Sequence, residues 1–286
     1  MKIYLDCYPC FLRQALSASR RAGGGEHQQL AVLKKTMTIL DRLDTGANPP
    51  EIARLVHNAV KQEISSTDPY REAKLESTKQ ALTLLPDIRQ LISNSENPID
   101  TAIRLAIAGN IMDLGVVENF GDLKQTIGRV LVQPFAIDHT HKLKEMISSA
   151  DHLLYLGDNA GETVFDRALI ETIDIPVVYG VRGFPVLNDA TRRDAVEAGI
   201  DTVATILSNG SDAPGTIVEL CSNQFAEVFR KAPVVIAKGQ GNYESLSTAG
   251  SHVFCLLQVK CPVIAEDIGA SVGSIVCRRS AVSSSG

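Results

Sequence analysis

The chain has 286 residues, of which 44% are hydrophobic, 21% charged and 5% aromatic. This apolar content is that of a globular protein and excludes a disordered or fibrous chain. With 28 basic and 33 acidic side chains, the formal net charge is -5, which argues against nucleic-acid binding because that requires clustered Lys and Arg. At about 150 residues per domain, the length fits one large domain or two unequal ones.

The hydropathy of the chain bears on its location in the cell. No apolar run reaches the roughly 18 residues that a membrane helix needs, and residues 1–6 turn polar too early for a signal peptide. We therefore expect a cytoplasmic protein that contacts no membrane. Without a secretion signal, the six cysteines are expected to be free thiols rather than a disulfide framework.

Apolar residues recur at three- and four-residue spacing through the first half of the chain, which predicts helices. Runs of glycine or proline, such as residues 23–25 and 48–50, separate these segments. No strand is expected before about residue 150. The predicted helices cover residues 11–21, 28–43, 50–64, 70–85, 99–114 and 123–131.

After residue 150 short apolar runs alternate with amphipathic segments, which is typical of βαβ units. The predicted fold is α/β, with a mostly parallel, Rossmann-like sheet covered by helices on both faces and an N-terminal all-helical subdomain. We expect residues 1–145 to form that subdomain, 146–280 the α/β core with the metal and phosphate site, and 281–286 a loose tail. The predicted strands are 152–157, 177–181, 202–206, 234–237 and 253–257, with helices at 162–173, 190–198 and 216–231.

Polar side chains follow three of these strands, at the edge where open parallel sheets bind ligands. Asp158 and Asp189 each precede a predicted helix, so helix capping is the simplest role for either residue alone. Their pairing at neighbouring strand ends favours another role. Together with the amide oxygen of Asn159, the two carboxylates would form an all-oxygen site for a divalent cation, with open positions for water.

Lys238 directly follows the fourth predicted strand and is next to a glycine, which suits a phosphate-binding point charge. A solvated surface lysine is the alternative interpretation. The Gly-x-Gly at residues 239–241 lacks the GxGxxG continuation, and the chain has no Walker motif. Neither a dinucleotide-binding fingerprint nor a P-loop is therefore predicted.

Cys7 and Cys10 form a CxxC pair that is able to hold a soft metal or to cycle between dithiol and disulfide. A single pair is only half of a zinc site, unless Cys261 approaches it in space. Packing residues without chemistry are the alternative for both cysteines.

In combination, these motifs resemble the metal-dependent damage-control phosphatases, the family first catalogued as domain of unknown function 89. The N-terminal CxxC is similar to that of the largely prokaryotic branch of the family. The segments that carry the resemblance are Asp158-Asn159-x-x-Glu162, Arg182-Gly-x-Pro-x-x-Asn188-Asp189, Lys238-Gly-x-Gly-Asn242-x-Glu244, Gly109-Asn110-x-x-Asp113 and Lys260-Cys261-Pro262-Val263-Ile264.

The resemblance implies a divalent metal, Mn, Co, Ni or Mg, held by Asp158, Asn159 and Asp189. It implies that Lys238 binds phosphate and that Asn242, the asparagine after the glycines, is a substrate- or phosphate-binding residue. Members of the family release phosphate from small phosphorylated metabolites, often sugar phosphates or damaged compounds related to cofactors. The pocket-lining residues that it implies are Asn110, Asp113, Glu162 and Arg182.

The resulting hypothesis is a divalent-metal-dependent phosphatase with Asp158, Asp189 and Lys238 as catalytic residues. The nucleophile is either a water activated by the metal or the Asp158 carboxylate. A non-catalytic metabolite-binding protein and a carboxylate methyltransferase are the competing hypotheses. The substrate, the metal and the oligomeric state are not determined by the sequence.

Overall fold

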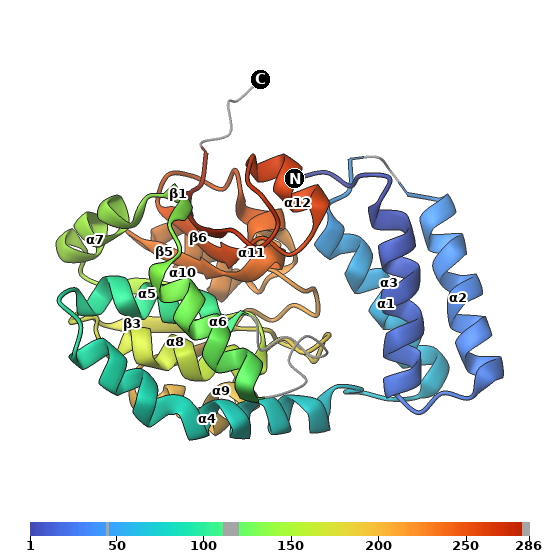
Figure 1. Cartoon of the computed structure of the whole chain (residues 1–286). Coiled ribbons are helices and arrows are strands. Elements are labelled where there is room, and N and C mark those ends of the chain that lie inside the picture. The colour runs from blue at the N-terminus through green and yellow to red at the C-terminus, as the bar shows by residue number, and fades with distance from the viewer. Residues whose placement is uncertain (44–45, 111–119, 282–286) are drawn as a thin grey trace.

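The computed structural model describes residues 1–43, 46–110 and 120–281. The N-terminal helices α1 (Cys7–Arg21), α2 (Glu26–Asp41) and α3 (Pro49–Ile64) form a bundle with its own apolar core, which includes Phe11 and Val56. Figure 1 shows this bundle to one side of the sheet. The long helix α4 (Arg71–Ser93) leads from the bundle to α5 (Pro98–Gly109) and α6 (Phe120–Val132), which pack with the sheet.

The described residues contain seven strands in one sheet, in the order β1-β7-β6-β5-β2-β3-β4. All neighbouring strands run parallel except β6 and β7. The strand order places β2 between β3 and β5, so the connections that follow β2 and β5 lead toward opposite edges of the sheet. The strands are β1 (Phe135–Asp138), β2 (Leu153–Leu156), β3 (Val177–Val181), β4 (Thr205–Ser208), β5 (Val235–Lys238), β6 (Val253–Gln258) and β7 (Ile275–Arg279).

Both faces of the sheet are covered, because alternate residues of the central strands belong to two different apolar clusters. Tyr155 belongs to the cluster that includes residues of α4, α5 and α8 (Thr163–Ile170), whereas Leu156 belongs to the cluster that includes residues of α10 (Asn223–Lys231), α11 (Gly239–Leu246) and α12 (Pro262–Ile268). The remaining helices are α7 (Thr140–Ser149), α8 (Thr163–Ile170), α9 (Arg192–Glu197), α10 (Asn223–Lys231), α11 (Gly239–Leu246) and α12 (Pro262–Ile268), with 3₁₀ turns η1 (Ala160–Glu162), η2 (Ile200–Thr202) and η3 (Val218–Leu220).

The predicted α/β class and mostly parallel sheet are confirmed, but several elements differ from the prediction. The expectation of no strand before residue 150 was wrong, because β1 lies at 135–138 and pairs with β7, which was also missed. The strand predicted at 202–206 begins three residues later, after η2. Helix α1 begins at Cys7, so the CxxC lies in the helix rather than before it. The predicted tail residues 282–286 and Asp113 lie outside the described residues.

No helix in the described ranges combines the length and the apolar character that a membrane crossing requires.

Candidate functional site

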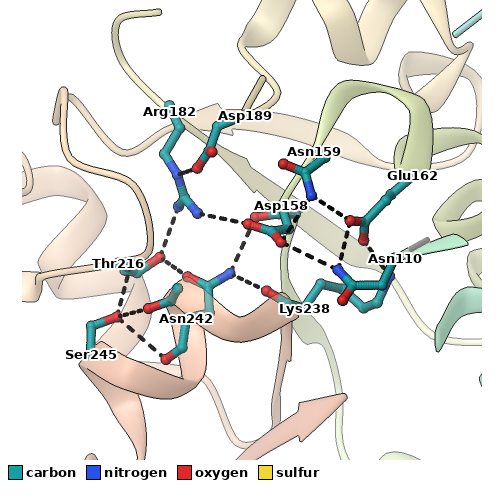
Figure 2. A network of polar contacts seen from close by, with 12 residues as sticks. Asn110, Asp158, Asn159, Glu162, Arg182, Asp189, Thr216, Lys238, Asn242 and Ser245 are labelled. Atoms are coloured by element: carbon teal, nitrogen blue, oxygen red, sulfur yellow. Dashed lines mark hydrogen bonds and ion pairs between the residues drawn. The ribbon is translucent and has the colours of Figure 1, made fainter. Parts of the chain in front are cut away.

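The polar residues singled out by the sequence meet at the carboxyl ends of β2, β3 and β5. Asp158 follows β2, Arg182 follows β3, and Lys238 is the last residue of β5. Since β2 lies between β3 and β5, this is the point of the sheet at which the strand order reverses, where α/β proteins bind ligands. Figure 2 shows the network that contains the site residues predicted from the sequence, which are Asn110, Asp158, Asn159, Glu162, Arg182, Asp189, Lys238 and Asn242.

Backbone contacts hold the loops after β2 and β3 together. An antiparallel bridge joins Asn159 to Asp189, and the Ala190 amide donates to the Asp158 carbonyl at 2.7 Å. The backbone that follows β5 approaches Asp158 at Gly239, which is the first residue of α11 and has a φ of +79°. A Cβ at Gly239 would lie only 1.8 Å from Asp158 Oδ2. Both the left-handed backbone and this close approach therefore require glycine.

Two amide side chains join the carboxylates of Asp158 and Glu162. Asn110 Nδ2 donates to Glu162 Oε1 at 2.6 Å and to Asp158 Oδ2 at 3.4 Å. Asn159 Nδ2 makes the same pair of contacts at 2.6 and 3.3 Å. Asn110 is the C-cap residue of α5, so the helical half of the chain contributes directly to the site.

Arg182 is buried and connects the acidic residues to a second set of hydrogen bonds, as Figure 2 shows. Its Nε donates to Asp189 Oδ2 at 2.6 Å, its Nη2 lies 3.8 Å from Asp158 Oδ1, and its Nη1 donates to Thr216 Oγ1 at 3.1 Å. Thr216 in turn donates to Asn242 Oδ1 at 2.8 Å. Asn242 Nδ2 donates to the Lys238 carbonyl at 2.7 Å, which ties the start of α11 to β5.

The ammonium group of Lys238 lies in the interior. Its Nζ donates to Asp166 Oδ1 at 2.7 Å and lies 3.3 Å from Glu162 Oε2, and the side chain has no solvent exposure. Asp166 also accepts hydrogen bonds from the hydroxyls of Tyr155 and Tyr179, each at 2.7 Å. Burial opposes the charge on Lys238, but Asp166 and Glu162 outweigh it and raise its pKa. Asp166, the ion-pair partner of Lys238, is not among the site residues predicted from the sequence.

A cavity of about 590 Å³ opens between the helical bundle and this network. Asp158, Asn159 and Asp189 lie on its wall, whereas Lys238 and Arg182 lie behind it. The cations on the wall are Lys260, two residues after β6, and Arg13 from α1. Its apolar wall comes from Pro9, Phe11, Pro49, Pro50, Ala53, Leu187, Pro214, Pro262 and Val263.

Lys260 is a further functional candidate, which the sequence analysis names only as part of the Lys260–Ile264 motif. Its positive charge lowers the pKa values of Asp158 and Glu162, although burial outweighs it at both carboxyls. The signal that identifies Lys260 was available, because the residues just after each strand form the ligand-binding edge and this rule also applies to the strand predicted at 253–257.

The site holds more acidic than basic groups. Four carboxylates (Asp158, Glu162, Asp166 and Asp189) lie with two buried cations, Arg182 and Lys238. Burial, followed by repulsion from Glu162 and Asp189, raises the pKa of Asp158 well above its ordinary value, and burial raises that of Glu162. A bound divalent cation would relieve this repulsion, so the charge and the oxygen donors both fit a hard metal.

The arrangement limits how such a metal would be held. Across the described ranges, no three side chains of His, Cys, Asp or Glu are grouped so as to hold a metal ion. A cation would therefore depend on amide and water ligands beside two carboxylates. Asn159 suits this role, since its Nδ2 is engaged by Glu162 and its oxygen lies on the opposite side of the amide.

The cysteines of the CxxC lie in the same cavity but outside the polar network. Cys7 and Cys10 are on the cavity wall, together with Cys261 from the start of α12. The helical bundle and the α/β core thus place Cys261 on the same cavity wall as the CxxC pair, which is far from it in the sequence.

Comparisons with known proteins agree with this architecture. The chain is 35% identical to an uncharacterised protein of Methanocaldococcus jannaschii, covering 96% of this chain and 95% of that protein. It is 31% identical to a damage-control phosphatase of Pyrococcus horikoshii (98% of both chains) and 30% identical to one of Archaeoglobus fulgidus (97% and 99%). A crystal structure of a DUF89 family protein from Pyrococcus horikoshii superposes with a TM-score of 0.90 at 31% identity, covering 98% of this chain and 99% of that one. The family described as "Damage-control phosphatase ARMT1-like domain" matches residues 3–276, and the chain belongs to this family.

Proposed function

We propose that the protein is a divalent-metal-dependent phosphatase that acts on small phosphorylated metabolites such as sugar phosphates or damaged cofactor-related compounds. The observation that carries this proposal is the buried cluster of four carboxylates, of which Asp158 and Asp189 lie on the wall of a cavity of about 590 Å³ together with Lys260. A phosphomonoester carries two negative charges, and binding it beside Asp158 and Asp189 requires cations. Relatives named damage-control phosphatases, at 30–31% identity over nearly the whole chain, support the same reaction.

Asp158, Asn159 and Asp189 are the residues that would hold the metal, and oxygen donors of this kind accept Mg, Mn, Co or Ni. When bound, a divalent cation offsets phosphoryl charge and makes water more acidic. Arg182 positions Asp189 by donating to one carboxylate oxygen at 2.6 Å. Asn110 and Asn159 hold Asp158 and Glu162 in a fixed relative position.

In this proposal Lys260 binds the phosphoryl group from the cavity wall. Lys238 remains a proposed phosphate-binding residue as well. Its contact with Asp166 is the shorter at 2.7 Å, so a phosphoryl oxygen would replace Glu162, which lies 3.3 Å away. Arg182 donates to Thr216, and Thr216 donates to Asn242. In this proposal these residues support the side of the site where Lys238 lies. Asp113, which the family resemblance implies as a pocket residue, lies outside the described residues.

The test is a panel of phosphorylated metabolites assayed for phosphate release with each of several divalent metals, before and after chelation. Asp158→Asn and Asp189→Asn should abolish release and weaken metal binding measured by equilibrium dialysis. Metabolite binding without phosphate release would instead indicate a binding protein, and methyl transfer to a carboxylate would indicate a methyltransferase.

The stereochemical outcome at phosphorus would identify the nucleophile. A covalent phosphoryl group on Asp158 requires two displacements and gives retention, whereas direct attack by water gives inversion. A substrate with a chiral phosphoryl group, prepared from the best metabolite of the panel, distinguishes these routes.

A further inference from the structure

All six cysteines are in the described part of the chain, and three of them lie on the wall of the site cavity. Cys7 and Cys10 belong to the first turn of α1, and Cys261 precedes α12. The proposed phosphatase chemistry uses none of these thiols. Cys255 and Cys277 are buried in the core, and Cys221 is half-buried away from the cavity.

The N-terminal residues hold the CxxC in this place. The Met1 ammonium donates to the Glu244 carbonyl in α11 at 2.7 Å, and the Tyr4 hydroxyl donates to Asp267 in α12 at 3.3 Å. Figure 1 accordingly shows the N-terminus beside α12. The segment before α1 is thus tied to the core, which fixes the first turn of α1 at the cavity.

The spacing of the pair allows a disulfide. Residues three apart in a helix have Cα atoms about 5 Å apart, within the window of roughly 4.4–6.8 Å that a disulfide needs. Both thiols are half-buried and line the cavity, so a small reagent that enters the cavity reaches them.

The surroundings of the two sulfurs differ. Gln14 Nε2 donates a hydrogen bond to Cys10 Sγ at 3.4 Å. Burial and the nearby Glu244 carboxylate raise the pKa of Cys7, which favours its thiol form. Cys10 is therefore the first attacking sulfur and Cys7 the resolving one. Burial raises the pKa of Cys221 to about 11, so that thiol is a poorly reactive control.

We propose that Cys7 and Cys10 form a reversible dithiol–disulfide couple on the wall of the site cavity, oxidised by low-molecular-weight disulfides. Cys10 attacks the disulfide, forms a mixed disulfide and releases one small thiol. Cys7 then attacks the Cys10 sulfur, so that the intramolecular bond forms, the mixed disulfide breaks and a second small thiol leaves. Two electrons pass from the protein to the reagent, and the two protein thiol protons end on the released thiols.

In this proposal the shape of the cavity wall depends on the redox state of Cys7 and Cys10. Oxidation would join the two sulfurs at a distance of about 2 Å and change the wall, while the carboxylate cluster around Asp158 would stay unchanged. On the basis of the proposed phosphatase function, oxidation should therefore raise KM by about threefold or more and leave kcat within about twofold.

The experiment equilibrates the full-length protein with reduced and oxidised glutathione, quenches it with an alkylating reagent and counts thiols by mass spectrometry. Six free thiols should fall to four, with Cys7 and Cys10 joined, and dithiothreitol should restore six. Cys7→Ser should accumulate a glutathione adduct on Cys10, and Cys10→Ser should show neither product. Cys221→Ser and Cys261→Ser should oxidise like the wild type.

Six thiols at every glutathione ratio, or a disulfide that includes Cys261, would overturn the proposal. An oxidised protein with unchanged KM would overturn the link to substrate binding. Thiol counting requires no enzymatic activity, so the couple is tested even if the chain hydrolyses no phosphoester. Conversely, the absence of the couple leaves the phosphatase proposal unaffected.

Discussion

Replacing Lys238 or Lys260 by methionine compares a fully buried cation with one that lies on the cavity wall. Lys238 has no solvent exposure and contacts Asp166 and Glu162, at 2.7 and 3.3 Å. Lys238→Met leaves these carboxylates buried without their counter-charge. Breaking a buried ion pair on one side in this way costs about 3–5 kcal/mol. For a chain of this size, the loss corresponds to a fall in Tm of about 6–20 °C.

Lys260→Met should behave differently, because Lys260 is half-buried on the cavity wall. The free energy of unfolding should change by less than about 1 kcal/mol. The loss of one charge-assisted hydrogen bond to phosphate, worth about 1.5–3 kcal/mol, should reduce kcat/KM by about 10- to 150-fold. Lys238→Met should also lower kcat/KM at temperatures well below its Tm, because the proposed site uses the Lys238 ammonium to bind phosphate.

Tm is measured by differential scanning calorimetry, and kcat/KM is measured by steady-state kinetics on the best substrate of the panel. Both variants are assayed at the same metal concentration. A Lys238→Met protein with the wild-type Tm would refute the energetic role of the buried ion pair. A Lys260→Met protein with wild-type kcat/KM would place phosphate recognition elsewhere, and Arg13 would be the next cation on the wall to test.

Three further predictions concern the metal, a glycine and an acid transition. A saturating divalent metal should raise the wild-type Tm, and Asp158→Asn and Asp189→Asn should abolish this rise, as thermal melts with and without chelator will show. Gly239→Ala should lose most activity and at least about 1–2 kcal/mol of stability, because φ is +79° and its Cβ would overlap Asp158; a wild-type denaturant midpoint would contradict this. Burial lowers the pKa of His57 from 6.5 to about 4, so the unfolded chain binds more protons between these values. The free energy of unfolding should therefore fall by up to about 3 kcal/mol as the pH drops through that window, and His57→Phe should show a shallower loss in urea melts at each pH.

The local pattern of the sequence was enough to predict the fold class and much of the site. Strand β2 at 153–156 lies within the run predicted at 152–157, because a continuous apolar segment bounded by polar residues is typical of a buried strand. The predicted proximity of Asp158 and Asp189 follows from a general property of parallel sheets, whose strand ends share one edge.

Elements with weak local patterns were missed. Strand β1 has only four residues, and its alternate residues are exposed. Strand β7 contains an apolar run of only three residues, 275–277, and its antiparallel pairing with β6 depends on residues that are about 20 positions away in the chain. Such strands form because a neighbouring strand offers hydrogen-bonding groups, which hydrophobic periodicity does not reveal.

The sequence by itself determined the alternation of strands and helices and the polar residues at the strand ends, because both depend on near neighbours in the chain. Only the tertiary structure decided that β2 lies between β3 and β5, that Lys238 is enclosed with Asp166, and that Lys260 faces the cavity. It also brought Cys7 to the wall that carries Cys261. Strand order, burial of charge and the walls of a cavity are set by contacts between distant segments, and a periodicity read over ten or twenty residues carries no information about them.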